Sequence, residues 1–400
     1  MSSRASAPLH GITVLDLTQI YNGPYATFLM AQAGATIIKI EPPTGEHLRK
    51  RVRSTGVVEP FAVLNCNKQS LTLNLRLPEA RDALLKLAAQ ADVIVENFAP
   101  GVMDRLGLGE AALREANPRI IIASSSGYGS AGPYRDYPAM DLTVQAMAGV
   151  MGITGEADGP PLKAGPALCD FSAGVHLYGA IVTALYERAA TGRAGTVEVS
   201  MLSAVYPSLL SSLGMHHRGD RSNKRTGNRH GGLTMAPYNV YPTADGAIAI
   251  LTANDGHWTA LTQALGCEHW QTDPRFADKA ARIAHMNALD ETVGEQTRTY
   301  PKEALFALLM QHRVPCAPVR ELDEVIHDEH LHAVGMLHWE QHPQYGEVLA
   351  HGSPLVFHDR ESPAYAPSRA LGADTADVLG RIGGLSGDEI QRLQELGALG

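Results

Sequence analysis

Asp170 is the side chain whose placement most needs a chemical explanation. It lies between Cys169 and Phe171, at the start of a long apolar segment typical of a buried helix over 171–190. Burying a carboxylate is costly unless something stabilises it. At a helix N-terminus, unpaired N–H groups and the helix dipole favour the anion by about 0.3 to 1 kcal/mol, and by up to about 2 kcal/mol if partly buried. We therefore predict a stabilised carboxylate, which can serve as a helix cap, as a nucleophile that needs no general base, or as both.

Cys169 is the alternative nucleophile, because a thiolate is more nucleophilic than a carboxylate. No basic partner lies near it in the sequence. Small buried cysteines are common in protein cores. We therefore predict that Cys169 packs in the core and takes no part in the chemistry.

The chain around these residues alternates strands with helices. Apolar or alternating runs typical of strands are found at 11–18, 36–41, 70–75, 92–98, 119–126 and 195–201. Helices are expected over 23–34 and 78–91, where Pro24 and Pro78 occupy early helical positions. This alternation predicts an α/β fold, a Rossmann-like doubly wound parallel sheet.

Ligands of such a sheet bind beyond the carboxyl ends of its strands. The loops expected there are rich in Gly, Pro and small polar residues, and they lie at 18–23, 41–46, 96–101 and 124–132. The last loop contains GYGSAG at 127–132, which matches the GxGxxG pattern of dinucleotide sites. Two prolines follow where the phosphate-binding helix should start. We therefore expect a ligand-facing loop there and no nicotinamide cofactor.

The length of the chain fits roughly two to three domains, and we expect two. The expected division is a large domain at 1–200, a linker at 201–225, a smaller α+β domain at 226–325 and a return segment at 326–400. A hairpin around Asp245–Gly246 and helices at 255–266 and 301–312 characterise the smaller domain. A strand within 345–357 and a helix at 387–399 are expected in the return segment, which completes the large domain.

The composition excludes several classes of protein. A net charge of −9 without a compensating basic stripe argues against a nucleic-acid partner. We find neither a signal-peptide pattern nor an apolar stretch of about 18 residues, so no membrane association is expected. The four cysteines are scattered without a CxxC pair. We therefore expect reduced thiols in the cytoplasm, with no disulfide framework and no metal site.

Taken together, the chain closely resembles the class III (CaiB/BaiF) family of coenzyme A transferases, which includes formyl-CoA transferase. Six blocks carry the resemblance in order, namely LDLTQIYNGPYATFLMAQAGATIIKIEPP, NCNKQSLTLNL, DVIVENFAPGVMDRLGLG, ALCDFSAGVHLYGAIVTALYERAATGR, APYNVYPTADG and ADTADVLGRIG. The resemblance implies a homodimer of interlocked rings with no tightly bound cofactor. The substrates it implies are an acyl-CoA and a free carboxylic acid.

The resemblance also implies a role for Asp170, which matches the covalent nucleophile of the family. Its carboxylate would attack an acyl-CoA thioester to give an aspartyl anhydride and CoA thiolate. The thiolate would then form an aspartyl-CoA thioester, and an incoming carboxylic acid would take over the CoA by the reverse steps. Asp170 is therefore the expected catalytic residue.

The family's CoA site can be carried over to matching positions. The residues expected to bind CoA are Tyr21, Asn22, Leu73, Asn74, Leu75, Arg76, Asn97, Phe98, Ala99, Arg105, Met140 and Asp141. Pro42 and Pro138 stand where formyl-CoA transferases carry an arginine and a lysine. Any phosphate contacts there would have to come from Lys39, Arg49 or Arg135.

Other matches leave alternatives open. Asp141 is expected either to steer the acyl group or the thiol, or to be only a helix N-cap. The glycine-rich segment 229–235 either closes over the intermediate or is a linker. A distal carboxylate of a dicarboxylic substrate could pair with Arg49, Arg53, Arg229 or His230. The acyl donor and the acceptor acid stay undetermined by the sequence.

Two other functions fit parts of the pattern. The α-methylacyl-CoA racemase branch shares the fold but needs a histidine as a second acid–base group, and that position here is Met140. A thioether cannot carry a proton, so transfer is favoured over racemisation. A non-catalytic acyl-CoA binder would not need Asp170, and a CoA-exchange assay separates it from a transferase.

Overall fold

The computed structural model describes residues 7–51, 59–219, 225–360 and 363–399. The chain forms two compact units. The first unit comprises Met1–Met147, Pro166–Tyr206 and Asp328–Gly400, and the second comprises Ala148–Gly165 and Pro207–His327. These bounds differ from the expected ones, because 148–165 belongs to the second unit. The expected linker at 201–225 is helical as far as His217, in α9 (Met201–Val205), η1 (Tyr206–Leu209) and α10 (Leu210–His217).

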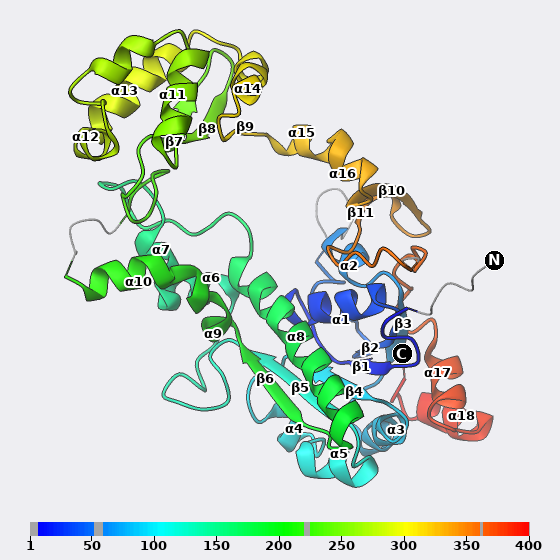
Figure 1. Ribbon diagram of the computed structural model, residues 1–400. Helices are drawn as coiled ribbons and strands as arrows, with labels where there is room; N and C mark the ends of the chain where they lie inside the picture. The colour runs from blue at the N-terminus through cyan, green and yellow to red at the C-terminus, as the bar shows by residue number, and fades with distance from the viewer. Residues whose placement is uncertain (1–6, 52–58, 220–224, 361–362, 400) are drawn as a thin grey trace. The chain divides into compact units, whose positions relative to one another are not determined.

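The first unit contains a six-stranded sheet with the order β3-β2-β1-β4-β5-β6 (Figure 1). Its strands are β1 (Thr13–Asp16), β2 (Thr36–Glu41), β3 (Lys68–Thr72), β4 (Val93–Glu96), β5 (Ile121–Ser126) and β6 (Thr196–Ser200). Every neighbouring pair is parallel. This is the strand order of a Rossmann-type doubly wound sheet, with the switch point between β1 and β4. The expected α/β class is confirmed.

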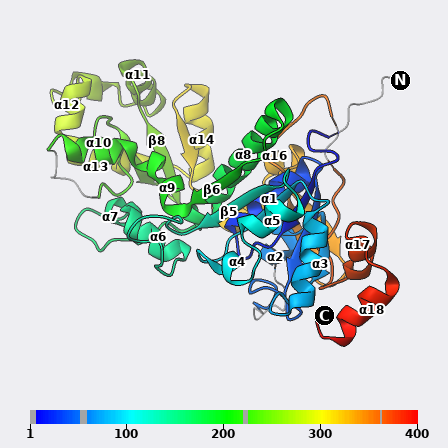
Figure 2. The same ribbon diagram turned by 90° about the horizontal axis from the view of Figure 1, so that it is seen from below.

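Helices cover both faces of this sheet (Figures 1 and 2). One core contains Val14 of β1 with residues of α1 (Asn22–Gln32) and α8 (Leu168–Thr191). The other core contains Leu15, the next residue of β1, with residues of α3 (Pro78–Ala88), α5 (Glu110–Ala116), α17 (Thr375–Arg381) and α18 (Gly387–Glu395). Successive side chains of a strand point to opposite faces, which explains why β1 has apolar residues at both Val14 and Leu15.

The remaining elements of the first unit are short. They are α2 (Glu59–Leu64), α4 (Val102–Arg105), α6 (Asp141–Ala148), which ends at the boundary, α16 (Glu329–Ala333), and the antiparallel pair β10 (Leu337–His342) and β11 (Gly346–His351). The sequence pattern did not predict β10. It did predict strand structure at β11 and a helix at α18.

Two strands are shorter than expected because their last side chains bond to the chain that follows. Asp16 Oδ1 accepts the backbone N–H of Thr18 at 2.9 Å, directly after β1. Glu96 Oε2 accepts the backbone N–H of Phe98 at 2.7 Å, directly after β4. These side-chain bonds turn the chain out of the sheet. They define the loops at the switch point.

Helix α8 corrects one expectation. Its 24 residues are by length and composition apolar enough to cross a membrane, whereas no such segment was expected. One helix of this kind is weak evidence for a membrane span, since the core helix of a globular protein passes the same test. Here Leu177, Ile181 and Ala184 of α8 are buried against the sheet and α1.

The second unit is built on a three-stranded antiparallel sheet. Its strands are β7 (Tyr238–Pro242), β8 (Ala247–Leu251) and β9 (Cys316–Pro318). Its other elements are α7 (Val150–Ile153), α10, α11 (Asp255–Ala264), η2 (Glu268–Thr272), α12 (Lys279–Ala284), α13 (Met286–Thr297), α14 (Lys302–Gln311) and α15 (Leu322–Ile326). The hairpin predicted around Asp245–Gly246 is confirmed, with Thr243 N–H donating to Gly246 O at 2.9 Å.

Candidate active site at the first turn of helix α8

Asp170 lies inside the first turn of α8. The helix begins at Leu168, three residues earlier than expected, and Ala167 precedes it without a side-chain cap. The Asp170 side chain therefore does not cap the helix, which corrects that interpretation. The residue is only 8% exposed. Within the described ranges, no hydrogen-bond donor or cation contacts its carboxylate.

Asp141 supplies the cap instead. Its Oδ1 accepts the backbone N–H groups of Cys169 at 2.8 Å and of Asp170 at 3.4 Å. Its Oδ2 accepts a hydrogen bond from Nε2 of Gln145 at 2.6 Å. Asp141 is the first residue of α6, yet its carboxylate serves the N-terminus of α8. A carboxylate is favourable there because the helix N-terminus carries a partial positive charge.

Burial and the neighbouring carboxylates raise the pKa values of Asp170 and Cys169. Burial, followed by the negative charge of Asp141, raises the pKa of Asp170 to about 7. Burial also raises the pKa of the Cys169 thiol to about 12, with further contributions from Asp141 and Asp170. At neutral pH Asp170 is therefore partly ionised, whereas Cys169 stays a neutral thiol. The prediction that Cys169 packs in the core agrees with its complete burial.

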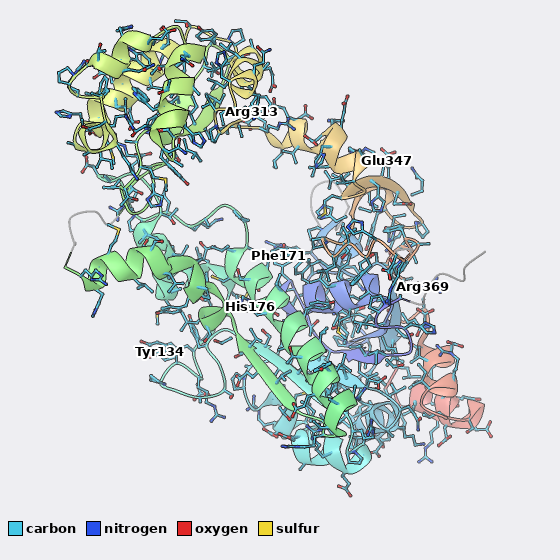
Figure 3. The ribbon with its side chains drawn as sticks, in the orientation of Figure 1. Tyr134, Phe171, His176, Arg313, Glu347 and Arg369 are labelled. Atoms are coloured by element: carbon cyan, nitrogen blue, oxygen red, sulfur yellow. The ribbon has the colours of Figure 1, made fainter. Side chains whose placement is uncertain are left out.

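Aromatic rings lie next to Asp170. The ring of Phe171 stacks on Tyr21 at a centroid distance of 5.7 Å and contacts Tyr25 edge-on at 5.1 Å. Figure 3 labels Phe171 and, further along α8, His176. The first turn of α8 therefore packs against the loop after β1 and the start of α1. Tyr21 was expected from the sequence, whereas Tyr25 and Phe171 were not.

Gly174 allows this close packing. A Cβ atom at this position would lie 2.6 Å from the backbone oxygen of Asn22 and 3.1 Å from the ring of Tyr25. Real Cβ atoms essentially never approach another atom to 2.6 Å, and a contact of 3.1 Å is unusually tight. The absence of a side chain therefore brings α8 against α1 one turn after Asp170.

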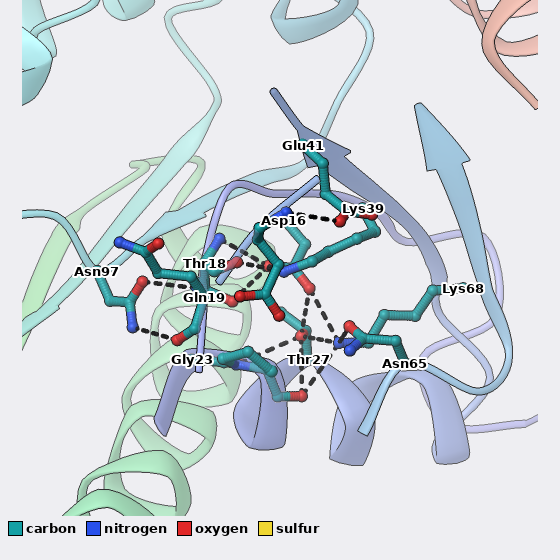
Figure 4. A network of polar contacts seen from close by, with 12 residues as sticks. Asp16, Thr18, Gln19, Gly23, Thr27, Lys39, Glu41, Asn65, Lys68 and Asn97 are labelled. Atoms are coloured by element: carbon teal, nitrogen blue, oxygen red, sulfur yellow. Dashed lines mark hydrogen bonds and ion pairs between the residues drawn. The ribbon is translucent and has the colours of Figure 1, made fainter. Parts of the chain in front are cut away.

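The loop after β1 is held from across the switch point (Figure 4). Asn97, directly after β4, accepts the Gln19 N–H at 2.8 Å and donates through Nδ2 to Gln19 O at 2.9 Å. The same Nδ2 donates to Oδ1 of Asn22 at 2.8 Å. The Asn97 amide thus fixes the backbone that carries Tyr21 and Asn22, and three of its hydrogen bonds are already used by the protein.

A buried ionic network lies beneath this loop (Figure 4). Lys68 donates to Asp16 Oδ2 at 3.0 Å and to Thr27 Oγ1 at 2.8 Å. Burial opposes ionisation of Asp16, but Lys39, Lys68 and hydroxyl donors outweigh it and lower its pKa to about 2. Burial lowers the pKa of Lys68 to about 8, although Asp16 opposes the shift. The network joins β1, α1 and β3 under the site.

A cavity of about 320 Å³ is lined by residues of β4, β5 and β6 and of the loops that follow β4 and β5. Phe98, Ala99 and Arg135 line it, together with Glu96 and Glu198. Burial raises the pKa of Glu96 to about 7, with a smaller contribution from Glu198. Helix α6 is the first helix after the GYGSAG segment, and it begins only at Asp141, so the segment has the context of a ligand-facing loop.

The other residues expected to bind CoA are more dispersed. The Leu73 side chain is 1% exposed in the core, so only its main chain is available to a ligand. Asn74 donates its N–H to Ala398 O at 2.8 Å. The remaining ones are Leu75, which packs partly buried on that core, Arg76 and Arg105, which are exposed, and Met140, which is 60% exposed.

Two proposed phosphate ligands are committed to other contacts. Lys39 is 1% exposed and donates to the backbone oxygen of Thr18. Arg49 pairs with Glu41 at 2.7 Å and lies 4.0 Å over the ring of Phe61. Neither is positioned to bind a phosphate group, which corrects that expectation. Arg135 is exposed and lines the cavity, with its Nε 3.7 Å from Asp136.

The candidates for a distal carboxylate do not form a cluster in the first unit. Arg229 lies in the second unit, where it pairs with Asp290 at 2.7 Å. His230, in the same unit, accepts the N–H of Gly232 at 3.0 Å within the glycine-rich segment 229–235. Arg53 lies outside the described residues. The role of that segment stays a prediction.

Gln145, Asp16 and Lys68 belong to the site but were missed by the sequence analysis. A signal for Gln145 was available, since it lies four residues after Asp141 on one helix. The charge of Asp16 inside an apolar run was a second signal. Among the described residues, no group of three His, Cys, Asp or Glu side chains could hold a metal ion.

Comparisons with known proteins agree with this geometry. A family model described as CoA-transferase family III matches residues 9–375. The formyl-CoA:oxalate CoA-transferase of Streptomyces avermitilis is 35% identical over 98% of this chain and 99% of its own. The acetyl-CoA:oxalate CoA-transferase of Acetobacter aceti is 35% identical over 91% and 93%. A CaiB/BaiF family protein from Brucella suis has a crystal structure with a TM-score of 0.84, at 31% identity over 94% of this chain and 100% of that one.

Proposed function

The chain belongs to CoA-transferase family III and is a CoA-transferase, and we propose that it moves CoA from a short acyl-CoA to oxalate through covalent intermediates on Asp170. The observation that carries the mechanism is the buried Asp170 carboxylate beside Asp141, which has a pKa of about 7. The substrates are proposed from relatives named for formyl-CoA or acetyl-CoA and oxalate. Oxalate also suits the dicarboxylic acid considered from the sequence.

The proposed reaction proceeds by four displacements at carbonyl carbons. An oxygen of Asp170 attacks the thioester carbon, and the C–S bond breaks to give a mixed anhydride and CoA thiolate. The thiolate attacks the Asp170 carbonyl and releases the first acid, which leaves an aspartyl-CoA thioester. The acceptor carboxylate attacks this thioester and frees the thiolate again. The thiolate finally attacks the acceptor's carbonyl, forming the new acyl-CoA and restoring Asp170.

The environment of Asp170 favours the first displacement. No cation stabilises its anion among the described residues, and Asp141 repels it, so the ionised carboxylate is held in an unfavourable state. Acylation removes the charge of Asp170 and therefore relieves this repulsion. A carboxylate with a pKa near the working pH is also more nucleophilic than an ordinary one, since basicity and nucleophilicity rise together.

The proposed CoA site lies along the carboxyl ends of the sheet. The 320 Å³ cavity lined by Phe98, Ala99 and Arg135 would hold part of the nucleotide or pantetheine. Arg105 lies at its rim, because a Cβ on the lining residue Gly101 would be 3.1 Å from its Nη1. Arg76 offers a further exposed positive charge after β3. CoA is proposed as a substrate, with no tightly bound cofactor.

The racemase alternative is disfavoured by the position of Met140. This residue precedes Asp141 where a racemase would need a histidine, and its thioether cannot exchange a proton. Solvent deuterium at the α-carbon of a branched acyl-CoA would reveal racemisation. We expect CoA exchange without such incorporation.

We further propose a cytoplasmic homodimer of interlocked rings. The chain crosses between its two units at 147/148, 165/166, 206/207 and 327/328. Large apolar side chains are exposed on α8, α10 and α15, including Tyr186, Leu210 and Leu322 at 76%, 71% and 80%. A second copy that covers them would explain this exposure. A stable, active monomer in sedimentation experiments would contradict the dimer.

The experiment that tests the substrate proposal is a panel of acyl-CoA donors against carboxylic acids, read by mass spectrometry of the CoA thioesters. Formyl-CoA or acetyl-CoA with oxalate should give oxalyl-CoA. Acetate, propionate and succinate serve as matched acceptors that differ in length and charge. Efficient transfer to another acid of the panel, with no oxalyl-CoA formed, would contradict the choice of oxalate.

A further inference from the structure

We propose that Gln145 is a positioning residue for this reaction, because it holds the Asp141 carboxylate against the first turn of α8 beside Asp170. The inference rests on the proposed function, since it concerns the nucleophile assigned there. Gln145 would act through Asp141 and would not itself contact a substrate.

The position of Gln145 suits this role. Its side chain is fully buried on α6, one helical turn after Asp141. Its Nε2 donates to Asp141 Oδ2 at 2.6 Å and lies 3.5 Å from Pro166 O, in the turn that leads into α8. The amide therefore joins α6, the Asp141 carboxylate and the start of α8.

The bonds of Asp141 explain why its orientation matters. Oδ1 accepts the N–H groups at the start of α8, and Oδ2 accepts the amide of Gln145. With both oxygens engaged, the carboxylate cannot rotate without losing a hydrogen bond. Its negative charge is therefore held at a fixed place beside Asp170.

The uncharged amide of Gln145 can hold Asp141 without neutralising it. An amide donates a hydrogen bond without adding charge. A lysine or arginine here would neutralise Asp141 and remove the repulsion that it exerts on Asp170. Glutamine thus fixes the carboxylate and leaves its field unchanged.

Asp141 is the charged side chain that raises the pKa of Asp170 in addition to burial. Cys169 precedes Asp170 on α8 as a neutral thiol, and Tyr21 and Tyr25 pack on the neighbouring Phe171 from the loop after β1 and α1. Burial and then Asp141 raise the pKa of Asp170 to about 7. Releasing Asp141 should therefore lower the pKa of Asp170 and weaken it as a nucleophile.

The test measures how fast the covalent adduct on Asp170 forms from acetyl-CoA and formyl-CoA, as a function of pH, in Gln145→Met and Gln145→Glu. Gln145→Met keeps the length of the side chain but removes the donor. We expect it to react about tenfold to a hundredfold more slowly at neutral pH, as for a misplaced group, with the acid limb of its pH–rate profile moved to lower pH. Gln145→Glu keeps the shape of the side chain and adds a carboxylate. The acid limb of its pH–rate profile should therefore move to higher pH.

Thr143→Val is the matched control on the same helix. Among the described residues, the Thr143 hydroxyl hydrogen-bonds only to the backbone of Met140, so its loss leaves every hydrogen bond of the Asp141 carboxylate in place. Its acid limb should stay where the native one is. If the limb moves equally in Thr143→Val, or stays unchanged in both Gln145 variants while the rate falls, Gln145 is merely structural and the inference is wrong. Should Gln145→Met not fold, the upward shift in Gln145→Glu decides alone.

The outcome separates this inference from the proposed function. If the native enzyme forms no adduct on Asp170, the proposed mechanism fails whatever the variants do. If the native enzyme forms it and both variants keep the native limb, only the inference about Gln145 fails.

Discussion

Lys68 Nζ lies 3.0 Å from Asp16 Oδ2, and the two side chains are only 1% and 0% exposed. Breaking such a pair from one side leaves Asp16 with the more distant Lys39, at 3.8 Å, as its cationic partner, and removing one partner of a buried pair costs about 3–5 kcal/mol. Lys68→Met should therefore lower the free energy of unfolding by about that amount, measured by urea denaturation. Lys86→Met is the control, because Lys86 and its partner Glu389 are about half exposed and its loss should leave stability nearly unchanged. Equal effects of the two substitutions would show that burial of the Asp16 network contributes little.

The close approach at Gly174 makes a second prediction. In Gly174→Ala the new methyl group would clash with the backbone of Asn22, so α8 must shift away from α1. Overpacking of this kind costs about 1–3 kcal/mol, and the rate should fall because Asp170 lies one turn away. Gly179→Ala lies on the same helix with no atom within 4 Å of its Cβ and should gain about 0.5–1 kcal/mol from helix propensity. Thermal unfolding would measure the stability of both variants, and CoA exchange would measure their rates. A Gly174→Ala enzyme with native stability and native rate would rule out the tight contact.

The raised pKa of Asp170 predicts the pH dependence of the reaction. Asp170 must be ionised to attack, so kcat/KM for the acyl-CoA should fall as the pH decreases through about 7. Asp141→Asn removes the neighbouring charge, so the fall of kcat/KM should move to lower pH. If kcat/KM of the native enzyme instead falls only near the ordinary carboxyl pKa of 3.8, burial and Asp141 do not raise the pKa of Asp170.

The same shift makes a prediction about stability. Because folding raises the pKa of Asp170, its ionised form opposes folding above about pH 7 and the cost disappears below about pH 4. Asp170→Asn should therefore stabilise the enzyme at pH 8 by up to about 3 to 4 kcal/mol, and by much less at pH 4. Urea unfolding at both pH values would measure this difference. Equal effects at the two pH values would mean that the charge of Asp170 is not destabilising.

The sequence predicts the sheet well because its signals are local. Buried strands such as β4 (Val93–Glu96) contain consecutive apolar residues, and Pro78 begins α3 as expected. The start of α8 was misplaced by three residues because its cap comes from Asp141, which is 29 residues away from Asp170 in the chain. Long-range contacts of this kind leave no local pattern.

The composition of the site was predictable only in part. Asp170, Asp141, Tyr21 and Asn22 were identified from the resemblance, and the structure brings them to one end of α8. Lys39 and Arg49 looked equally available as cations, yet buried partners on β1 and β2 engage both. A charge in a sequence does not reveal its partner, so the phosphate ligands could not be chosen without the fold.

The most direct measurement is the mass of the Asp170 peptide after the enzyme is incubated with acetyl-CoA or formyl-CoA and no acceptor acid, then treated with hydroxylamine. We expect a hydroxamate on Asp170, loss of activity, the same product in Cys169→Ala, and no product in Asp170→Asn. The Asn variant should still bind CoA while losing turnover by several orders of magnitude, as enzymes do without their covalent nucleophile. A modification on Cys169 instead, or normal turnover by Asp170→Asn, would show that Asp170 is not the covalent nucleophile.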